Sequence, residues 1–245
     1  GDLLVLDAGT GVRRLGASLP ADLARIDILL THLHMDHIQG LGFFAALFRP
    51  GLEVHIWGPP SVTMGVRRRL ARYLSPPLFP IRMADLSCRL ELHDAPVGTF
   101  EVGGAVVTAD LVCHPGPTLG YRIDDGTATL AYLPDHEPAL GSLEFKPHKG
   151  WTSGLALADG VDLLVHDAQY TLEEYPSHVG WGHSALDHAI AFAGAAGAGR
   201  LVAFHHDPAH DDATLDRLFA DMPEQVVGAR EGAVFRLGET VLEAV

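Results

Sequence analysis

Cysteines, basic residues and long hydrophobic runs are all scarce in this sequence of 245 residues. The two cysteines, Cys88 and Cys113, are too few for a disulfide framework, so we expect reduced, buried thiols in a cytoplasmic protein. No apolar run approaches the roughly 18–20 residues that a membrane-spanning helix needs. The first residues lack the basic start of a signal peptide. We therefore expect no association with a membrane.

Basic residues are outnumbered by acidic ones, with 17 Lys and Arg against 31 Asp and Glu and a net charge of −14. Proteins hold long nucleic acids by neutralising phosphates with Lys and Arg. An acidic chain without a broad basic stripe is therefore not expected to bind them. One basic cluster occurs on an expected helix, at Arg67, Arg68, Arg69 and Arg72. It is interpreted as a solvated helix face, or alternatively as a clamp for one phosphate group of a small substrate.

Histidine is abundant, with 15 in the chain. The run from Thr31 to His37 contains four residues of metal-ligand type, namely His32, His34, Asp36 and His37. The preceding residues 26–30 are apolar and branched, which is typical of a buried strand, and a helix is expected over residues 38–48. Imidazole and carboxylate groups suit zinc, manganese and iron. This strand-end cluster therefore indicates a metal site.

The remaining apolar patterns predict a mixed α/β chain, and its length needs only one domain, residues 1–245. Strands over residues 88–92, 99–102 and 105–112 alternate apolar and polar residues, as half-buried antiparallel strands do, with a hairpin turn at Gly103-Gly104. Ser184 is an expected N-cap. The other expected strands are residues 3–6, 52–57, 119–123, 129–133, 162–165, 201–204, 226–227 and 233–237, and the other expected helices are residues 62–74, 184–198 and 213–222.

The run His32-x-His34-x-Asp36-His37 resembles the His-x-His-x-Asp-His motif of the metallo-β-lactamase superfamily, whose members are mostly dinuclear hydrolases. The resemblance implies a four-layer αββα sandwich. Family members carry one or two further strands before the segment that Asp7-x-Gly9-x-Gly11 matches, so N-terminal strands are expected to be missing. Asp7 is expected to support the metal loop without binding metal.

The same resemblance implies two divalent metal ions, with zinc expected and manganese or iron as alternatives. His32, His34 and His114 would hold the first ion. Asp36, His37 and His205 would hold the second, with Asp135 shared, and His206 stays the alternative to His205. A bridging hydroxide between two such ions, about 3.5–4 Å apart, would be the nucleophile.

Two later segments resemble parts of ribonuclease Z. The segment His166-Asp167-Ala168-Gln169 resembles its His-Glu-Ala-Thr segment, and Gly182-His183-Ser184-Ala185 resembles its His-Ser-Thr segment. This implies catalytic roles for Asp36, Asp167 and His183, with His183 as a general acid that Asp167 orients; the alternative for His183 is a packing histidine. His166 is expected to support the site. The segment between His114 and Asp135 is too short for the arm with which ribonuclease Z grips tRNA. A small phosphodiesterase-like branch is therefore favoured.

The predicted function is hydrolysis of a small cyclic or linear phosphodiester by a metal-dependent enzyme. Two alternatives remain at this point. One is a carbonyl hydrolase on the same metals, such as a lactonase, a thioesterase or a weak β-lactamase, and the other is a metal or redox protein without hydrolytic activity. Whether the chain forms a homodimer is also open. No role is assigned to His55, His93, His136, His148, His178 and His188.

Overall fold

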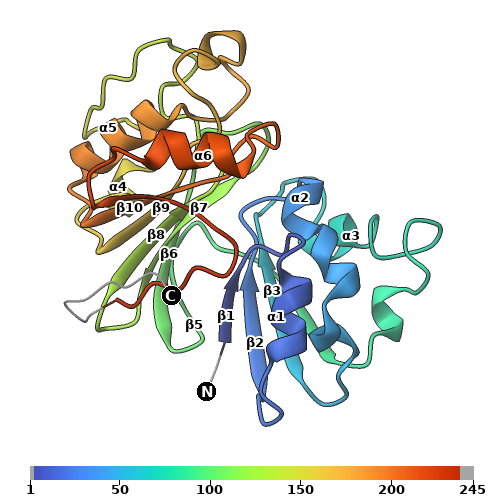
Figure 1. The fold of residues 1–245 in the computed structure, drawn as a ribbon. Helices are drawn as coiled ribbons and strands as arrows, with labels where there is room; N and C mark the ends of the chain where they lie inside the picture. The colour runs from blue at the N-terminus through green and yellow to red at the C-terminus, as the bar shows by residue number, and fades with distance from the viewer. Residues whose placement is uncertain (1–2, 238–245) are drawn as a thin grey trace. The chain divides into compact units, whose positions relative to one another are not determined.

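The computed structural model describes residues 3–237 of the chain. Its backbone divides into two compact units, one ending at Gly104 and the other beginning at Ala105. Each unit contains strands of one main sheet and three α-helices (Figure 1). The expected mixed α/β class with two sheets is confirmed. The prediction that residues 1–245 form a single domain stays a prediction.

The first unit has a four-stranded sheet in the order β1-β2-β3-β4, and all of its strand pairs are parallel. The inner strand β2 is buried on both faces, as parallel strands are, and its buried Asp27 accepts hydrogen bonds from Arg25. The helices lie on one face of this sheet (Figure 1). The bounds are β1 Leu3–Leu6, α1 Val12–Ser18, β2 Arg25–Leu29, α2 Met35–Ile38, β3 Glu53–Gly58, α3 Val66–Leu70, β4 Arg89–Asp94 and β5 Gly98–Val102.

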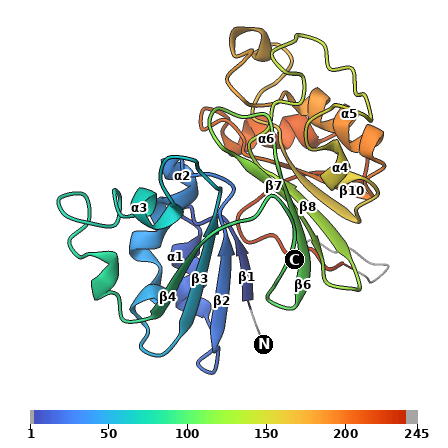
Figure 2. The ribbon, with the colours of Figure 1, turned by 180° about the vertical axis from the view of Figure 1, so that it is seen from behind.

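The second unit contains six strands in the order β11-β10-β9-β8-β7-β6. The pairs from β8 to β11 are parallel, whereas β6–β7 and β7–β8 are antiparallel. Helices α4 and α5 pack on this sheet (Figure 2). The bounds are β6 Ala105–Leu111, β7 Leu119–Asp124, β8 Thr129–Leu133, α4 Leu155–Ala158, β9 Leu163–Asp167, α5 Leu186–Ala196, β10 Arg200–Phe204, α6 Asp212–Phe219 and β11 Val226–Gly228.

Several element predictions are wrong in detail. The helix expected over residues 38–48 is replaced by α2 and two 3₁₀ helices, Gln39–Phe43 and Ala45–Phe48. Glycine is a poor helix former, and this segment contains Gly40, where an added Cβ would lie 1.9 Å from the carbonyl oxygen of Gly9. The helix expected over residues 62–74 is shorter in the structure, where it corresponds to α3. The backbone N–H of its first residue, Val66, donates to the Asp94 carboxylate at 2.9 Å.

Two strand predictions also fail. Strand β4 pairs with β3 in parallel and not in antiparallel fashion. Its alternating burial arises because successive side chains point to opposite faces of the sheet, and Leu90 and Leu92 pack against the core of the first unit. Residues 233–237, expected as a strand, contain no strand in the structure. None of the helices within residues 3–237 combines the length and the apolar character that crossing a membrane requires.

Candidate metal centre

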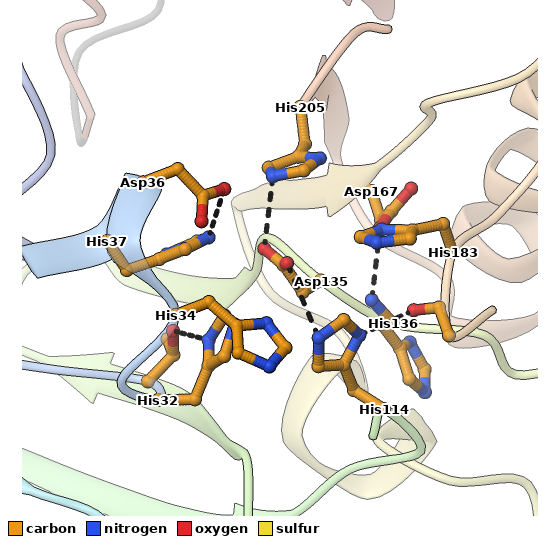
Figure 3. A network of polar contacts seen from close by, with 12 residues as sticks. His32, His34, Asp36, His37, His114, Asp135, His136, Asp167, His183 and His205 are labelled. Carbon is orange, nitrogen blue, oxygen red and sulfur yellow. Dashed lines mark hydrogen bonds and ion pairs between the residues drawn. The ribbon is translucent and has the colours of Figure 1, made fainter. Parts of the chain in front are cut away.

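The metal loop, residues 31–37, leaves the carboxyl end of β2 and runs into α2. His34 stands in extended backbone directly before the helix, so the histidines on either side of it turn toward a common point. The rings of His32 and His37 lie with centroids 4.2 Å apart, and His32 Nε2 lies 2.8 Å from His34 Nδ1 (Figure 3). His37 Nε2 is 3.3 Å from Asp36 Oδ2. The first unit therefore brings together all four residues predicted from the loop.

Asp7 holds the metal loop in place from the end of β1. Its carboxylate accepts from the Thr31 backbone N–H at 2.7 Å and from the Thr31 hydroxyl at 2.9 Å. It also lies 2.8 Å from His37 Nδ1. A carboxylate can only accept, so Nδ1 of His37 carries the proton and Nε2 offers a lone pair for a metal. The predicted contact of Asp7 with the loop is confirmed.

Asp135 stands just beyond β8 in the second unit and is 1% exposed. Its two oxygens face two different imidazoles: Oδ2 lies 3.7 Å from His114 Nε2, and Oδ1 lies 3.6 Å from His205 Nε2. These separations exceed a hydrogen bond. They are close to the spacing of two ligands on one ion, which is about 3.3–3.6 Å for tetrahedral bonds of 2.0–2.2 Å.

His114 and His205 are both held with Nε2 toward Asp135. His114 Nδ1 donates to the carbonyl oxygen of Gly182 at 2.9 Å, which leaves Nε2 unprotonated. His205 has a φ of 58°, and Asp7 has the same value at the end of β1. Left-handed backbone at a residue other than glycine costs about 1–3 kcal/mol and is concentrated at functional sites. Of these two strand-end residues, His205 is a predicted ligand and Asp7 holds the metal loop.

His205 and not its neighbour His206 lies beside Asp135. The ring of His206 packs against Phe219 of α6, with centroids 5.6 Å apart. Burial lowers the pKa of His206. The geometry of the second unit therefore favours His205 of the two candidates.

Asp167 and His183 form a short pair, with Asp167 Oδ2 2.6 Å from His183 Nδ1 (Figure 3). Asp167 is fully buried, and its oxygens also accept from the backbone N–H groups of Gln169, Ser184 and His136 at 3.0–3.2 Å. A carboxylate that accepts this many hydrogen bonds is held in one orientation. It fixes Nδ1–H of His183 and directs Nε2 away from itself.

His183 stacks on His205, with ring centroids 5.0 Å apart and planes within 10°. The ring of His114 lies edge-on to His183 at the same centroid distance. Asp167, His183 and His205 could together hold an ion. In the 2.6 Å contact, however, Asp167 accepts a hydrogen bond from His183 Nδ1, so these two atoms are already engaged with each other. The pair is therefore suited to proton transfer.

Glu137 was not predicted from the sequence, yet it holds the segment that carries His183. Its buried carboxylate accepts from the N–H groups of Gly180 and Gly182 and from the Tyr175 hydroxyl, each at 2.8 Å. Gly182 has no room for a side chain, since a Cβ there would lie 2.6 Å from His114 Nδ1. A glutamate two residues after Asp135 carries no recognisable motif, so only the folded chain reveals this role.

Two further expectations change in the second unit. Ser184 does not cap α5; its hydroxyl donates to the His136 carbonyl at 2.6 Å, and Ala185 occupies the cap position. His136, which had no assigned role, is fully buried and lies 3.0 Å from His166 Nε2. His166 Nδ1 in turn donates to the Asp167 carbonyl at 2.7 Å. Burial keeps the pKa of His136 and His166 below the usual value, so both are neutral supports of the Asp167 segment.

A family described as the beta-lactamase superfamily domain matches residues 3–206 of the chain. The chain belongs to this superfamily. Ribonuclease Z of Mycobacterium avium (strain 104) is 29% identical to it over 234 residues, which cover 85% of this chain and 77% of that protein.

Two solved structures of similar fold cover 94% of this chain. The metallo-β-lactamase fold protein YhfI from Bacillus subtilis has a TM-score of 0.67 at 20% identity and is covered over 85% of its length. A diphosphatase of the PhnP family has a TM-score of 0.65 at 21% identity and is covered over 77% of its length.

Membership of the beta-lactamase superfamily confirms the resemblance, the fold class and the prediction of a metal-dependent hydrolase. This fold implies a divalent metal, and the donor set fits one. Each unit presents imidazole nitrogens beside a carboxylate at ligand-to-ligand spacing, with the opposite ring nitrogens of His37 and His114 fixed by hydrogen bonds. Such outer contacts are typical of metal-binding histidines.

Proposed function

We propose that the chain is a dinuclear phosphodiesterase that acts on a small cyclic or linear phosphodiester. The observation that carries this proposal is the Asp167–His183 pair, a buried carboxylate 2.6 Å from an imidazole that stacks on the predicted ligand His205. Phosphodiester hydrolysis needs a proton for the leaving alkoxide, and a positioned imidazole can supply it. The similarity to ribonuclease Z supports phosphorus chemistry.

The proposed ligands divide between two ions. His32, His34 and His114 would hold one, and Asp36, His37 and His205 the other, with Asp135 shared. The support for a shared carboxylate is that its two oxygens face His114 and His205 separately. Two divalent ions, zinc in this proposal, would lower the pKa of water and stabilise charge on the phosphoryl oxygens. Asp36 would serve catalysis by orienting this site through its contact with His37.

His183 would act as the general acid. Its Nδ1 proton stays with Asp167, so the proton given to the leaving oxygen would come from Nε2. Asp167 would stabilise the imidazolium form before that transfer and fix the ring plane. General acid–base catalysis of this kind contributes typically about 10²–10⁴-fold to a rate.

The proposal of a small substrate rests on two features. The segment between His114 and Asp135 is occupied by β7 and β8, joined by a short turn, so it contains no extended arm. The net charge of −14 also opposes binding of a long polyanion. A homodimer and a cytoplasmic location remain predictions.

A substrate panel tests this function. We expect turnover of bis(p-nitrophenyl) phosphate and of 2′,3′-cyclic nucleotides, with kcat/KM at least 100-fold above that for a lactone, a thioester and a β-lactam. Turnover of a carboxylic substrate without turnover of any phosphodiester would replace the proposal with the carbonyl-hydrolase alternative. Bound iron with redox activity and no hydrolysis at all would replace both.

A further inference from the structure

A hollow of about 480 Å³ lies beside the metal loop within the first unit, between α2 and α3. This volume falls within the range of small-molecule sites. Its wall includes Leu33 and Met35, which alternate along the chain with the predicted ligands His32, His34 and Asp36. Consecutive Cα atoms are only about 3.8 Å apart. A molecule in this hollow, the α2–α3 hollow, therefore lies within one small substrate's length of the metal loop.

The lining of the α2–α3 hollow is mostly apolar and includes two cationic residues. Met35 is 52% exposed and Leu78 71% exposed, so the apolar lining is open to solvent. Exposed apolar groups gathered in a hollow are typical of binding sites. Tyr73 contributes its ring and is anchored by a 2.6 Å hydrogen bond from its hydroxyl to the Gln39 carbonyl.

The cationic residues of the lining are Arg69 and Arg72. Arg69 is mostly buried, and its Nη2 contacts the Pro59 carbonyl and, at 3.5 Å, Asp94. Within residues 3–237 the structure gives Arg72 no ion pair or side-chain hydrogen bond, although it is exposed and lines the hollow. A guanidinium group left available in a chain of net charge −14 selects for a negatively charged group.

We propose that the α2–α3 hollow binds the part of the substrate that is not cleaved off, and that this part is an apolar group carrying a negative charge of its own. This inference rests on the proposed function. Met35 and Leu78 would contact the apolar body of this group, and Arg72 would pair with its negative charge. The occupant is a small molecule and not a protein, because a specific protein interface covers about 800 Å² per partner, far more than so small a hollow offers.

Paired phosphodiesters test the inference by turnover. The probes are p-nitrophenyl phosphates whose second ester group is methyl, phenyl or 3-carboxyphenyl. For each protein, kcat/KM for the carboxyphenyl ester is divided by kcat/KM for the phenyl ester. We expect Arg72→Ala to lower this quotient about tenfold. Leu78→Ser should lower the phenyl-to-methyl ratio several-fold. Arg67, exposed on α3 and outside the hollow, provides the matched control Arg67→Ala, which should leave both ratios within about twofold. Ratios that change equally in Arg67→Ala and Arg72→Ala would overturn the inference.

Binding of naphthalene-1-sulfonate separates this inference from the proposed function. Its sulfonate is a poor metal ligand, and calorimetry measures its Kd without any turnover. We expect Arg72→Ala to weaken binding about tenfold and Arg67→Ala to leave it unchanged. Wild-type protein that binds the sulfonate through Arg72 but cleaves no phosphodiester would refute the proposed function alone. Active protein whose sulfonate affinity is the same in both variants would refute the α2–α3 hollow as a site.

Discussion

Three buried aspartates show how the surroundings of one residue type determine its role. Asp7 and Asp167 receive hydrogen bonds at 2.6–3.2 Å from backbone groups, a hydroxyl and an imidazole. Asp135 faces two imidazoles at 3.6 and 3.7 Å, close to the spacing of two ligands on one ion. The first two are therefore suited to orienting histidines, and Asp135 is suited to an ion.

Replacing Asp135 tests the proposed shared ligand. We expect Asp135→Ala to lose at least one metal ion per chain. Loss of a residue that only supports a ligand lowers metal affinity roughly 10–100-fold, and the metal affinity of Asp135→Ala should fall by more than this. Elemental analysis after dialysis measures the bound metal. Asp221→Ala provides the matched control, because Asp221 is exposed. Two tightly bound metals with full activity in Asp135→Ala would contradict the ligand assignment.

Asp167→Asn tests the orientation of His183. The amide nitrogen would face His183 Nδ1 and the His136 N–H, so the imidazole would lose its acceptor. We expect a fall in kcat of roughly 10²-fold or more, with metal content unchanged. The decrease in rate at high pH that deprotonation of a general acid causes should also disappear. An unchanged pH–rate profile would show that His183 is only a packing residue.

At the scale of elements, Glu137 connects the end of β8 to the segment that bears His183. In Glu137→Gln an amide would face at least one N–H group of Gly180 or Gly182, leaving a buried donor unsatisfied. We expect a loss of about 1–3 kcal/mol in the free energy of unfolding, measured by urea denaturation, together with a lower kcat.

The exposed Glu173 provides the control, Glu173→Gln, which should change neither stability nor kcat measurably. A Glu137→Gln protein as stable and as active as this control would mean that the segment holds its position without Glu137.

Glu174 ties the turn after β9 to His210, with 2.9 Å between Oε1 and the imidazole Nε2. Burial raises the pKa of Glu174, but hydrogen bonds from His210 and Thr171 outweigh it and lower the pKa to about 2. A pKa that is lower in the folded than in the unfolded protein stabilises the folded state. This stabilisation is fully present above the pKa of the unfolded protein, about 4.3, and is lost as the pH falls toward 2.

We therefore expect Glu174→Gln to cost about 1 kcal/mol at pH 6, a value limited by solvent screening, and to cost little at pH 2.5. Thermal unfolding at both values measures this difference. An equal cost at both pH values would show that the carboxylate charge is not involved.

The success of the sequence-based predictions depended on how local the signal was. His32, His34, Asp36 and His37 were predictable because they lie within one loop, and β10 was predictable from the apolar run that ends at His205. The contact between His183 and Asp167 spans 16 residues and was predicted only through the resemblance. Glu137 acts on residues more than 40 positions away, and its environment has no counterpart in local sequence.

Element ends were less predictable than element types. Helix α5 stops at Ala196, two residues before the predicted end, because Gly197 takes a left-handed φ of 66°. Helix α3 is shorter than predicted because Asp94, on a strand 28 residues away, caps its start. Pairing partners and caps of this kind are tertiary features that a sequence pattern does not contain.

For the whole molecule, we propose that residues from both parts of the chain serve one phosphodiester hydrolysis. The proposed ligands comprise His32, His34, Asp36 and His37 before Gly104, and His114, Asp135 and His205 after it. The proposed acid, His183, is in the second unit. Metal content and activity must therefore be measured on the same preparation of the full chain.

The most direct measurement is metal per chain together with turnover of a 2′,3′-cyclic nucleotide, whose leaving alkoxide needs a proton, in wild type and in His183→Ala. We expect two metals per chain in both proteins and a kcat that falls about 10²–10⁴-fold in the variant. Two metals per chain with no phosphodiester turnover in the wild type would refute the phosphodiesterase function, and full turnover in His183→Ala would refute the general acid.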